Sequence, residues 1–328
     1  MNQKAAAVRV FVALLFGTVY VLFTTSANAP AAPPKDHNGV NGSDYAAAVH
    51  EVSYRTRSVV CSKYTFLLVV VHSAVRNFKL RQSIRDTWAD ARDTWRQEAV
   101  RTVFILGESE DVGDQSRVDE ENHIHNDVVQ ARFLDSYANL TRKHFVALKY
   151  ATESCQSADH IVKVDDDVFI NLPAIISYLS TSRTKDNIMC NVLKHEFPNR
   201  NPRHKLFISE KEYPDNEYPP FCMGMAIIYS RHAANMLVTE AENAKFIDKI
   251  DDVYFGGILP RKLRIPLEDL RGKYSETGAN TLEWVRSGDA RPAWFYFALV
   301  WHRPRGGMKH VWMKVRANQR ETQGSLLS

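Results

Sequence analysis

Short apolar runs alternate with amphipathic stretches from residue 59 onward. Four runs have the length and composition of strands: Tyr64–Val71, Thr102–Leu106, His160–Val164 and Met225–Tyr229. The first is continuous and rich in β-branched residues, which suits a strand covered on both faces. Leu80, Ile84 and Trp88 recur every four residues and predict one face of a helix, and residues 140–148 repeat that pattern. Strands that alternate with helices predict an α/β domain at 59–328 with a mostly parallel central sheet.

The start of the chain has a different pattern. Residues 10–23 form an uncharged apolar run that Lys4 and Arg9 precede. With its neighbours the run reaches the roughly 20 residues of a membrane-spanning helix, and the basic residues place its N-terminus in the cytosol. A cleaved signal peptide with its exit at Ala27–Ala29 is the alternative, although Pro30 directly after it disfavours cleavage. The predicted divisions are a cytosolic tail at 1–9, a signal-anchor transmembrane helix at 10–27 and a lumenal stem at 28–58.

The stem is rich in Pro, Ala, Gly and Asn, and it has too few large apolar residues to form a core. Asn41-Gly42-Ser43 within it is a candidate N-glycosylation site, and Asn139-Leu140-Thr141 in the domain is a second. Such short sequons also occur by chance. Either reading of the N-terminus places the domain in an oxidising lumen, where disulfides form.

Composition excludes several classes of protein. A 45% apolar fraction excludes a fully disordered chain. The net charge of +4 is too small to indicate a nucleic-acid partner. The four cysteines include no C-x-x-C pair, which excludes a zinc ribbon or a thioredoxin-like redox motif. They allow three disulfide pairings, and the sequence does not choose among them.

The strongest chemical signal is the triplet Asp165-Asp166-Asp167 between the apolar segments IVKV and VFI. Parallel sheets bind ligands beyond the carboxyl ends of their strands, which is where the triplet lies. Adjacent carboxylates repel one another unless they are solvated or paired with a cation. In an extended segment, Asp165 and Asp167 point to the same side and would converge on Mg²⁺ or Mn²⁺. The alternative is a solvated acidic turn.

A second acidic pair, Asp251-Asp252, precedes Gly256 and Gly257. The glycines would let the backbone approach a ligand closely. One carboxylate free of metal would then serve as a general base. The alternative is an aspartate that caps the helix beginning there. A third candidate is His302, which follows the strand-like run Phe295–Trp301 and would complete a metal shell.

Six blocks, in this order, resemble the β-1,3-glycosyltransferases, the family of galactosyl- and N-acetylglucosaminyltransferases related to Fringe. The resemblance covers residues 61–312. The blocks are Arg81–Trp88 (RQSIRDTW), Val103–Gly107 (VFILG), Asn126–Thr141 (NDVVQARFLDSYANLT), Lys163–Asn171 (KVDDDVFIN), Tyr218–Gly224 (YPPFCMG) and Asp251–Gly256 (DDVYFG). Lys205–Ser209 reads KLFIS where many members carry KWYVS, a difference that bears on substrate preference.

The resemblance implies a GT-A fold, a Rossmann-like nucleotide-sugar domain. It implies that Asp167 ligates Mn²⁺ (or Mg²⁺), that Asp165 lies beside the ribose and the metal, and that His302 is the distant metal ligand. Asp252 would be the general base. Asp251, which replaces the commoner Glu, would lie with Tyr218 and Gly224 in the acceptor or sugar site. The residues implied at the nucleotide-sugar site are Arg81, Arg85, Lys163, Asp165 and Asp166; for the two arginines, ion pairs that hold the first helix are the alternative.

The implied activity is inverting, metal-dependent β-1,3 transfer from a UDP-sugar to a glycan acceptor on a glycoprotein or glycolipid. The implied location is the Golgi membrane, as a single-pass type II protein with a lumenal catalytic domain. The sequence does not settle the donor, and UDP-galactose is favoured over UDP-N-acetylglucosamine. Two alternatives are a membrane-tethered sugar-binding protein without catalysis and a haloacid-dehalogenase-type phosphatase, in which Asp165 would be a nucleophile.

Overall fold

A computed structural model describes residues 51–90, 99–181, 186–287, 292–300 and 307–326, with side chains described as far as residue 318. The predicted tail and anchor, most of the stem, Asn41 and His302 lie outside these residues. No helix within the described part combines the length and the apolar composition that a membrane crossing requires.

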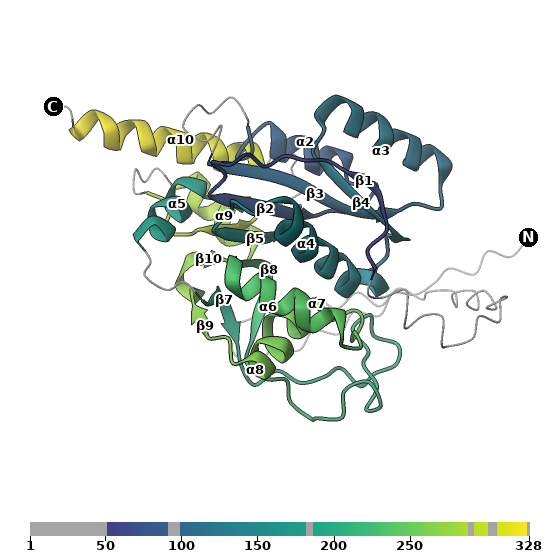
Figure 1. Cartoon of the computed structure of the whole chain (residues 1–328). Helices are drawn as coiled ribbons and strands as arrows, with labels where there is room; N and C mark the ends of the chain where they lie inside the picture. The colour runs from purple at the N-terminus through teal and green to yellow at the C-terminus, as the bar shows by residue number, and fades with distance from the viewer. Residues whose placement is uncertain (1–50, 91–98, 182–185, 288–291, 301–306, 327–328) are drawn as a thin grey trace, which may run out of the picture. The chain divides into compact units, whose positions relative to one another are not determined.

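The main sheet has eight strands, in the order β1-β4-β3-β2-β5-β8-β7-β9 (Figure 1). Its central strands β4, β3, β2 and β5 are parallel, whereas β1 and β8 run antiparallel to their neighbours. The predicted α/β class with a mostly parallel sheet is therefore confirmed. The strands are β1 (Tyr54–Arg57), β2 (Leu67–His72), β3 (Val100–Glu108), β4 (Val128–Leu134), β5 (His160–Asp165), β7 (Ile188–Leu193), β8 (Phe221–Ser230) and β9 (Leu267–Asp269).

β1 falls within the stretch that the sequence assigns to the stem. Its residue Thr56 pairs with Gln130 of β4, so the folded domain begins before residue 59. The short strand was not predicted because its alternating polar residues, YRTR, carry no apolar signal.

A second sheet holds three described strands in the order β10-β11-β6. They are β6 (Val168–Ile170), β10 (Tyr274–Ser275) and β11 (Phe297–Leu299). β5 ends at Asp165 in the main sheet and β6 begins at Val168 in the second sheet. The aspartate triplet therefore begins at the last residue of β5 and continues through the two-residue turn by which the chain passes between the two sheets.

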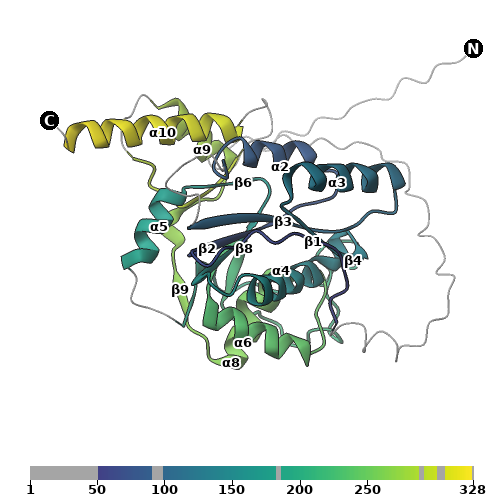
Figure 2. The ribbon, with the colours of Figure 1, turned by 45° about the horizontal axis from the view of Figure 1, so that its top comes forward.

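Helices cover both faces of the main sheet (Figures 1 and 2). One face carries α2 (Phe78–Arg85), α3 (Val112–His125) and α10 (Gly307–Leu326), and the other carries α4 (Leu140–Ser154), α6 (Arg231–Glu242) and α8 (Leu259–Leu263). The other helical segments are η1 (Tyr137–Asn139), α5 (Leu172–Thr181), α7 (Asp251–Val253), η2 (Tyr254–Ile258), η3 (Arg271–Lys273) and α9 (Gly278–Arg286).

The alternation of side chains along β2 explains why two cores form. Leu68 and Val70 join the core beneath α4 and α6, whereas Leu67, Val69 and Val71 join the core on the side of α2. Every one of these side chains is fully buried, as the continuous apolar run predicts for a strand covered on both faces.

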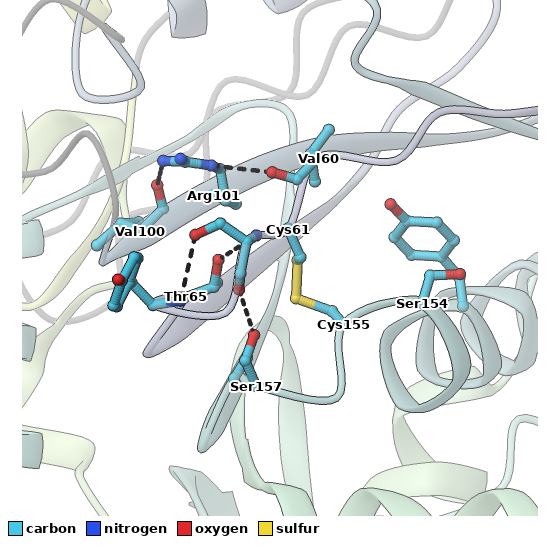
Figure 3. The surroundings of a disulfide bond; sticks show 12 residues. Val60, Cys61, Thr65, Val100, Arg101, Ser154, Cys155 and Ser157 are labelled. Atoms are coloured by element: carbon cyan, nitrogen blue, oxygen red, sulfur yellow. Dashed lines mark hydrogen bonds between the residues drawn. A yellow bond between two sulfur atoms is a disulfide. The ribbon is translucent and has the colours of Figure 1, made fainter.

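Two disulfides decide among the three possible pairings. Cys61–Cys155 joins the segment before β2 to the end of α4, and Cys190–Cys222 joins β7 to β8. Figure 3 shows the surroundings of the first, where Ser157 and Arg101 donate hydrogen bonds to backbone carbonyls of the segment that carries Cys61. The segment is thus held to β3 on one side of the disulfide and to the turn after α4 on the other.

Gly256 and Gly257 have a role different from the predicted one. A Cβ on Gly257 would lie 2.6 Å from the Cβ of Phe221, and one on Gly256 would lie 2.8 Å from the Cβ of Cys222. The glycines therefore let η2 pack directly against β8. The expectation that they admit a ligand is wrong, because side chains of the protein fill that space.

This packing predicts that Gly257→Ala destabilises the fold. Overpacking of a close contact costs about 1–3 kcal/mol, more than the roughly 1 kcal/mol that a helical Gly→Ala change contributes. Gly272→Ala is the matched control, since no atom lies within 4 Å of a Cβ built there. Thermal unfolding of both variants should show a lower Tm only for Gly257→Ala, and equal Tm values would contradict this account.

Candidate active site

A cavity of about 690 Å³ lies at the carboxyl ends of β2 and β5. The turn after β4, the first part of α4, the loop between β7 and β8, the start of β8, and α7 also line it. Asp165, Asp166 and Asp167 line it together with Asp251 and Asp252. The structure thus brings together the two acidic motifs that the sequence places 86 residues apart (251 − 165).

The first two aspartates of the triplet have fixed partners. Lys163 Nζ donates to Asp165 Oδ1 at 2.7 Å and also to the carbonyl of Gly224. Asp166 Oδ2 accepts from Ser73 Oγ at 2.6 Å and from Asn77 Nδ2 at 2.9 Å. The side chain of Asp165 is 43% exposed. The protein packed around it raises its pKa, against the opposing effect of Lys163.

The chain turns at Asp166 and Asp167, so the expected extended geometry of the triplet is wrong. The turn, rather than the side-to-side alternation of a strand, brings all three carboxylates to the cavity. The backbone carbonyl of Asp167 accepts a hydrogen bond from the Val300 nitrogen at 3.1 Å, which ties the turn to the end of β11.

Asp251 belongs to a buried chain of hydrogen bonds. Its Oδ2 lies 2.9 Å from His144 Nδ1, and His144 Nε2 lies 2.9 Å from the Tyr229 hydroxyl. Burial lowers the pKa of His144, so the imidazole is neutral, donates from Nδ1 to Asp251 and accepts at Nε2 from Tyr229. Burial alone would raise the pKa of Asp251, but the hydrogen bond from His144 and the charge of Lys163 lower it. Asp251 is therefore ionised.

The environment of Asp252 shifts its pKa in the opposite direction from that of Asp251. Burial and the adjacent charge of Asp251 raise its pKa to about 7, although it accepts a 2.8 Å hydrogen bond from the Val253 nitrogen. Gly224 leaves room for it, since a Cβ there would lie 3.1 Å from Asp252 Oδ2. The residue before α7 is Ile250 and no side chain caps that helix, so the capping alternative is wrong. A carboxylate with a pKa near neutrality is suited to accept a proton.

The two arginines do not line the cavity. Arg81 is fully buried, and its guanidinium pairs with Glu121 at 2.6 Å and donates to Ser73 Oγ at 3.0 Å. Arg85 pairs with Glu121 at 2.7 Å and with Asp127 at 2.8 Å. Both arginines therefore match the alternative interpretation, in which they form ion pairs that hold the first helix, α2. Arg81 also orients Ser73, whose hydroxyl donates to Asp166.

Tyr218 and Gly224 both line the cavity, as expected for a site on YPPFCMG. Asn139 is half-buried, and its amide nitrogen donates to the Leu134 carbonyl at 2.8 Å. That nitrogen is the atom that a glycan would use, so in the folded chain it is already engaged.

Sequence reasoning missed three cavity residues of the turn after β4 and the start of α4. Asp135 Oδ1 accepts from Lys143 Nζ at 2.6 Å, and Lys143 also donates to the Ser73 carbonyl at 2.7 Å. Tyr137 lines the same cavity. Asp135 and Tyr137 lie in the block that resembles DSYANLT-type sequences, which was the available signal.

The chemistry of the donors fits a hard divalent cation held partly by a ligand. No group of three or more His, Cys, Asp or Glu side chains within the described ranges is arranged to hold a metal by itself. Asp165 and Asp167 supply carboxylate oxygens at one cavity, and Mg²⁺-type ions typically take one or two carboxylates plus substrate phosphates.

Comparison with known proteins gives consistent results. Residues 79–271 match the family profile described as Galactosyltransferase. The chain is 35% identical over 209 residues to β-1,3-galactosyltransferase 5 of Pan troglodytes, covering 63% of this chain and 69% of that protein. It is 31% identical over 202 residues to β-1,3-galactosyltransferase 1 of Mus musculus, covering 61% of each.

Solved structures are more distant. The galactosyltransferase LgtC, in complex with donor and acceptor sugar analogs, superposes with a TM-score of 0.37 at 9% identity, over 76% of this chain and 95% of that one. Mouse xyloside xylosyltransferase 1 gives a TM-score of 0.36 at 12% identity, over 72% of this chain and 97% of that one. Similarity at this level adds nothing to the assignment of fold or function.

The buried chain through His144 predicts a pH-dependent stability difference. His144→Phe leaves Asp251 and Tyr229 without their partner and should lower the free energy of unfolding at pH 7 by about 1–3 kcal/mol. Because the pKa of His144 is lowered in the fold, wild type loses stability as pH falls below the ordinary value of 6.5, and the variant lacks this loss. The free energies of unfolding of wild type and His144→Phe, measured by urea titration, should therefore differ less at pH 5 than at pH 7.

Tyr229→Phe is the matched control, because it removes one hydroxyl and keeps the His144–Asp251 pair. Tyr229→Phe should lower the free energy of unfolding by less than His144→Phe does. Its free energy of unfolding should depend on pH as that of wild type does. If the free energies of unfolding of wild type and His144→Phe differed more at pH 5 than at pH 7, the assigned protonation states would be contradicted.

Proposed function

The chain belongs to the galactosyltransferase family and is a glycosyltransferase, and we propose that it is an inverting β-1,3-galactosyltransferase that uses UDP-galactose. The observation that carries the mechanism is Asp252, a carboxylate with a pKa of about 7 in the same cavity as the aspartate triplet. The names of the similar proteins support galactose over N-acetylglucosamine as the transferred sugar and a 3-hydroxyl as the acceptor group. A GT-A arrangement of the α/β domain is part of this proposal.

The triplet side of the cavity binds the donor. Asp165 and Asp167 would hold Mn²⁺ or Mg²⁺ together with the diphosphate of the UDP-sugar. When bound there, such a cation would supply positive charge against the negative charge that develops on the leaving diphosphate. Lys163 fixes Asp165, and Ser73 and Asn77 fix Asp166, so the carboxylates are oriented before the donor binds.

Asp252 acts on the acceptor. Its carboxylate takes the proton of the acceptor 3-hydroxyl as the oxygen attacks the anomeric carbon of the donor. A new C–O bond forms on one face while the bond to the diphosphate breaks on the other, and UDP leaves with the electron pair. One displacement of this kind inverts the α-linked donor into a β-linked product.

The cellular setting in this proposal is the Golgi lumen, with a glycoprotein or glycolipid glycan as acceptor and the N-terminal segment as a type II anchor. The two disulfides support an oxidising compartment. No observation favours a phosphatase or a catalytically inert lectin.

The base assignment predicts the behaviour of Asp252→Asn. This substitution keeps the size of the side chain and removes its ability to take a proton, so transfer should fall by at least about a hundredfold. The dissociation constant for UDP should change little, because the diphosphate binds at the triplet. The measurement is UDP-galactose turnover with a β-linked sugar acceptor, alongside calorimetric titration of UDP. Glu110→Gln, an exposed acid outside the cavity, is the control. Near wild-type transfer by Asp252→Asn would refute the assignment.

The metal assignment predicts a different result for Asp167→Asn. The variant should lose the strengthening of UDP binding by Mn²⁺ as well as turnover, whereas UDP binding measured with EDTA should match that of wild type. Titration of UDP with and without Mn²⁺ separates these effects. A variant that retains the full Mn²⁺-dependent gain in UDP affinity would show that Asp167 is not a ligand.

A further inference from the structure

Two exposed aromatic side chains line the cavity that contains Asp252. Tyr137 of η1 is 47% exposed and Phe197, in the loop between β7 and β8, is 66% exposed. The other strongly exposed aromatic residues of the described part, Tyr64 and Trp294, lie outside this cavity. Single exposed apolar residues are common on proteins. Two that share a cavity with a candidate base indicate a surface shaped for a ligand.

The backbone on both sides of Phe197 is fixed. The carbonyl of the preceding residue, Glu196, accepts from the Tyr218 nitrogen at 2.9 Å. Further along the loop, Arg200 donates to the carbonyl of Tyr213 at 2.8 Å. Phe197 is therefore held open to solvent by a folded loop, and its exposure is not that of a free end.

Tyr137 shares its cavity with Asp252 and Asp251, and their charges act on its hydroxyl. Burial raises its pKa, and the next largest contributions come from the charges of Asp252 and then Asp251. The ammonium of Lys205 lies 5.3 Å from the centre of the Tyr137 ring. The ring is 47% exposed despite this contact.

The combination of groups matches a sugar ring. A pyranose carries C–H bonds on its faces and hydroxyls around its edge. Aromatic rings have an electron-rich face that packs well against C–H groups, and carboxylates such as Asp251 and Asp252 accept hydrogen bonds from hydroxyls. The aromatic rings therefore suit the faces of an uncharged acceptor sugar, and the carboxylates suit its hydroxyls.

We propose that Tyr137 and Phe197 form an acceptor subsite that holds the pyranose ring of a β-linked hexose beside Asp252. The proposal rests on the proposed function, because it names the side chains that present the acceptor hydroxyl to the base. It also divides the cavity into a donor end at the triplet and an acceptor end at the aromatic pair.

The test is a kinetic comparison of Phe197→Ala with Phe197→Tyr in the full-length chain. UDP-galactose is the donor, and methyl β-D-galactopyranoside and methyl N-acetyl-β-D-glucosaminide are the acceptors. Loss of the ring should raise the acceptor KM about fivefold to tenfold, as expected for one aromatic contact. The KM for UDP-galactose should stay within about twofold of wild type. Phe197→Tyr keeps the ring and should restore the wild-type acceptor KM. Tyr64→Ala, an exposed aromatic outside the cavity, is the matched control.

A second readout separates this proposal from the proposed function. Binding of the two methyl glycosides is measured by ligand-observed NMR without any donor, for wild type, Phe197→Ala and Tyr137→Ala. If wild type transfers no sugar but binds a glycoside that both alanine variants lose, the subsite stands and the proposed reaction fails. An unchanged acceptor KM and unchanged glycoside binding would overturn the subsite. It would also be overturned if the KM for UDP-galactose rose instead, or if wild type bound neither glycoside.

Discussion

The buried ammonium of Lys163 lies between the two acidic motifs of the cavity. Lys163 is almost fully buried and donates to Asp165 and to the carbonyl of Gly224 in β8. Burial alone would lower its pKa, but the charges of Asp165, Asp251 and Asp252 raise it above the ordinary value. Carboxylates gathered in one cavity repel one another unless a cation lies among them. Lys163 thus helps the two acidic motifs to share a site even before a metal binds. It lies on β5, two residues before Asp165.

The elements that were predictable are those whose signal lies in contiguous residues. The apolar run of β2 and the IVKV segment of β5 predict buried strands, and both strands are buried. The aspartates at the end of β5 line the cavity, as expected. β1 was missed because its residues alternate without a strong apolar face. The role of Gly257 was misread because a sequence does not show whether a ligand or Phe221 fills the space beside a glycine.

The partners of site residues were less predictable, because they come from distant parts of the chain. His144 was recognised only as one position on a helix face, yet it joins Asp251 to Tyr229. Arg81 and Arg85 belong to a block that resembles the family, but their guanidinium groups pair with acidic residues at the end of α3 and just after it. A motif that resembles a family does not show whether its side chains contact a ligand or hold another residue that does. Arg81 holds Ser73, whose hydroxyl donates to Asp166.

Asp251 and Asp252 show how adjacent residues of one type acquire opposite properties. Asp251 receives a hydrogen bond from a neutral imidazole and the field of Lys163, which keep it ionised. Its negative charge, added to burial, raises the pKa of Asp252 to about 7. A proton on Asp252 is therefore held weakly enough to leave near neutral pH and strongly enough to be accepted from a hydroxyl during attack. The basicity of Asp252 depends on the ionisation of Asp251. That ionisation depends in turn on α4, because this helix carries the buried His144 that hydrogen-bonds to Asp251.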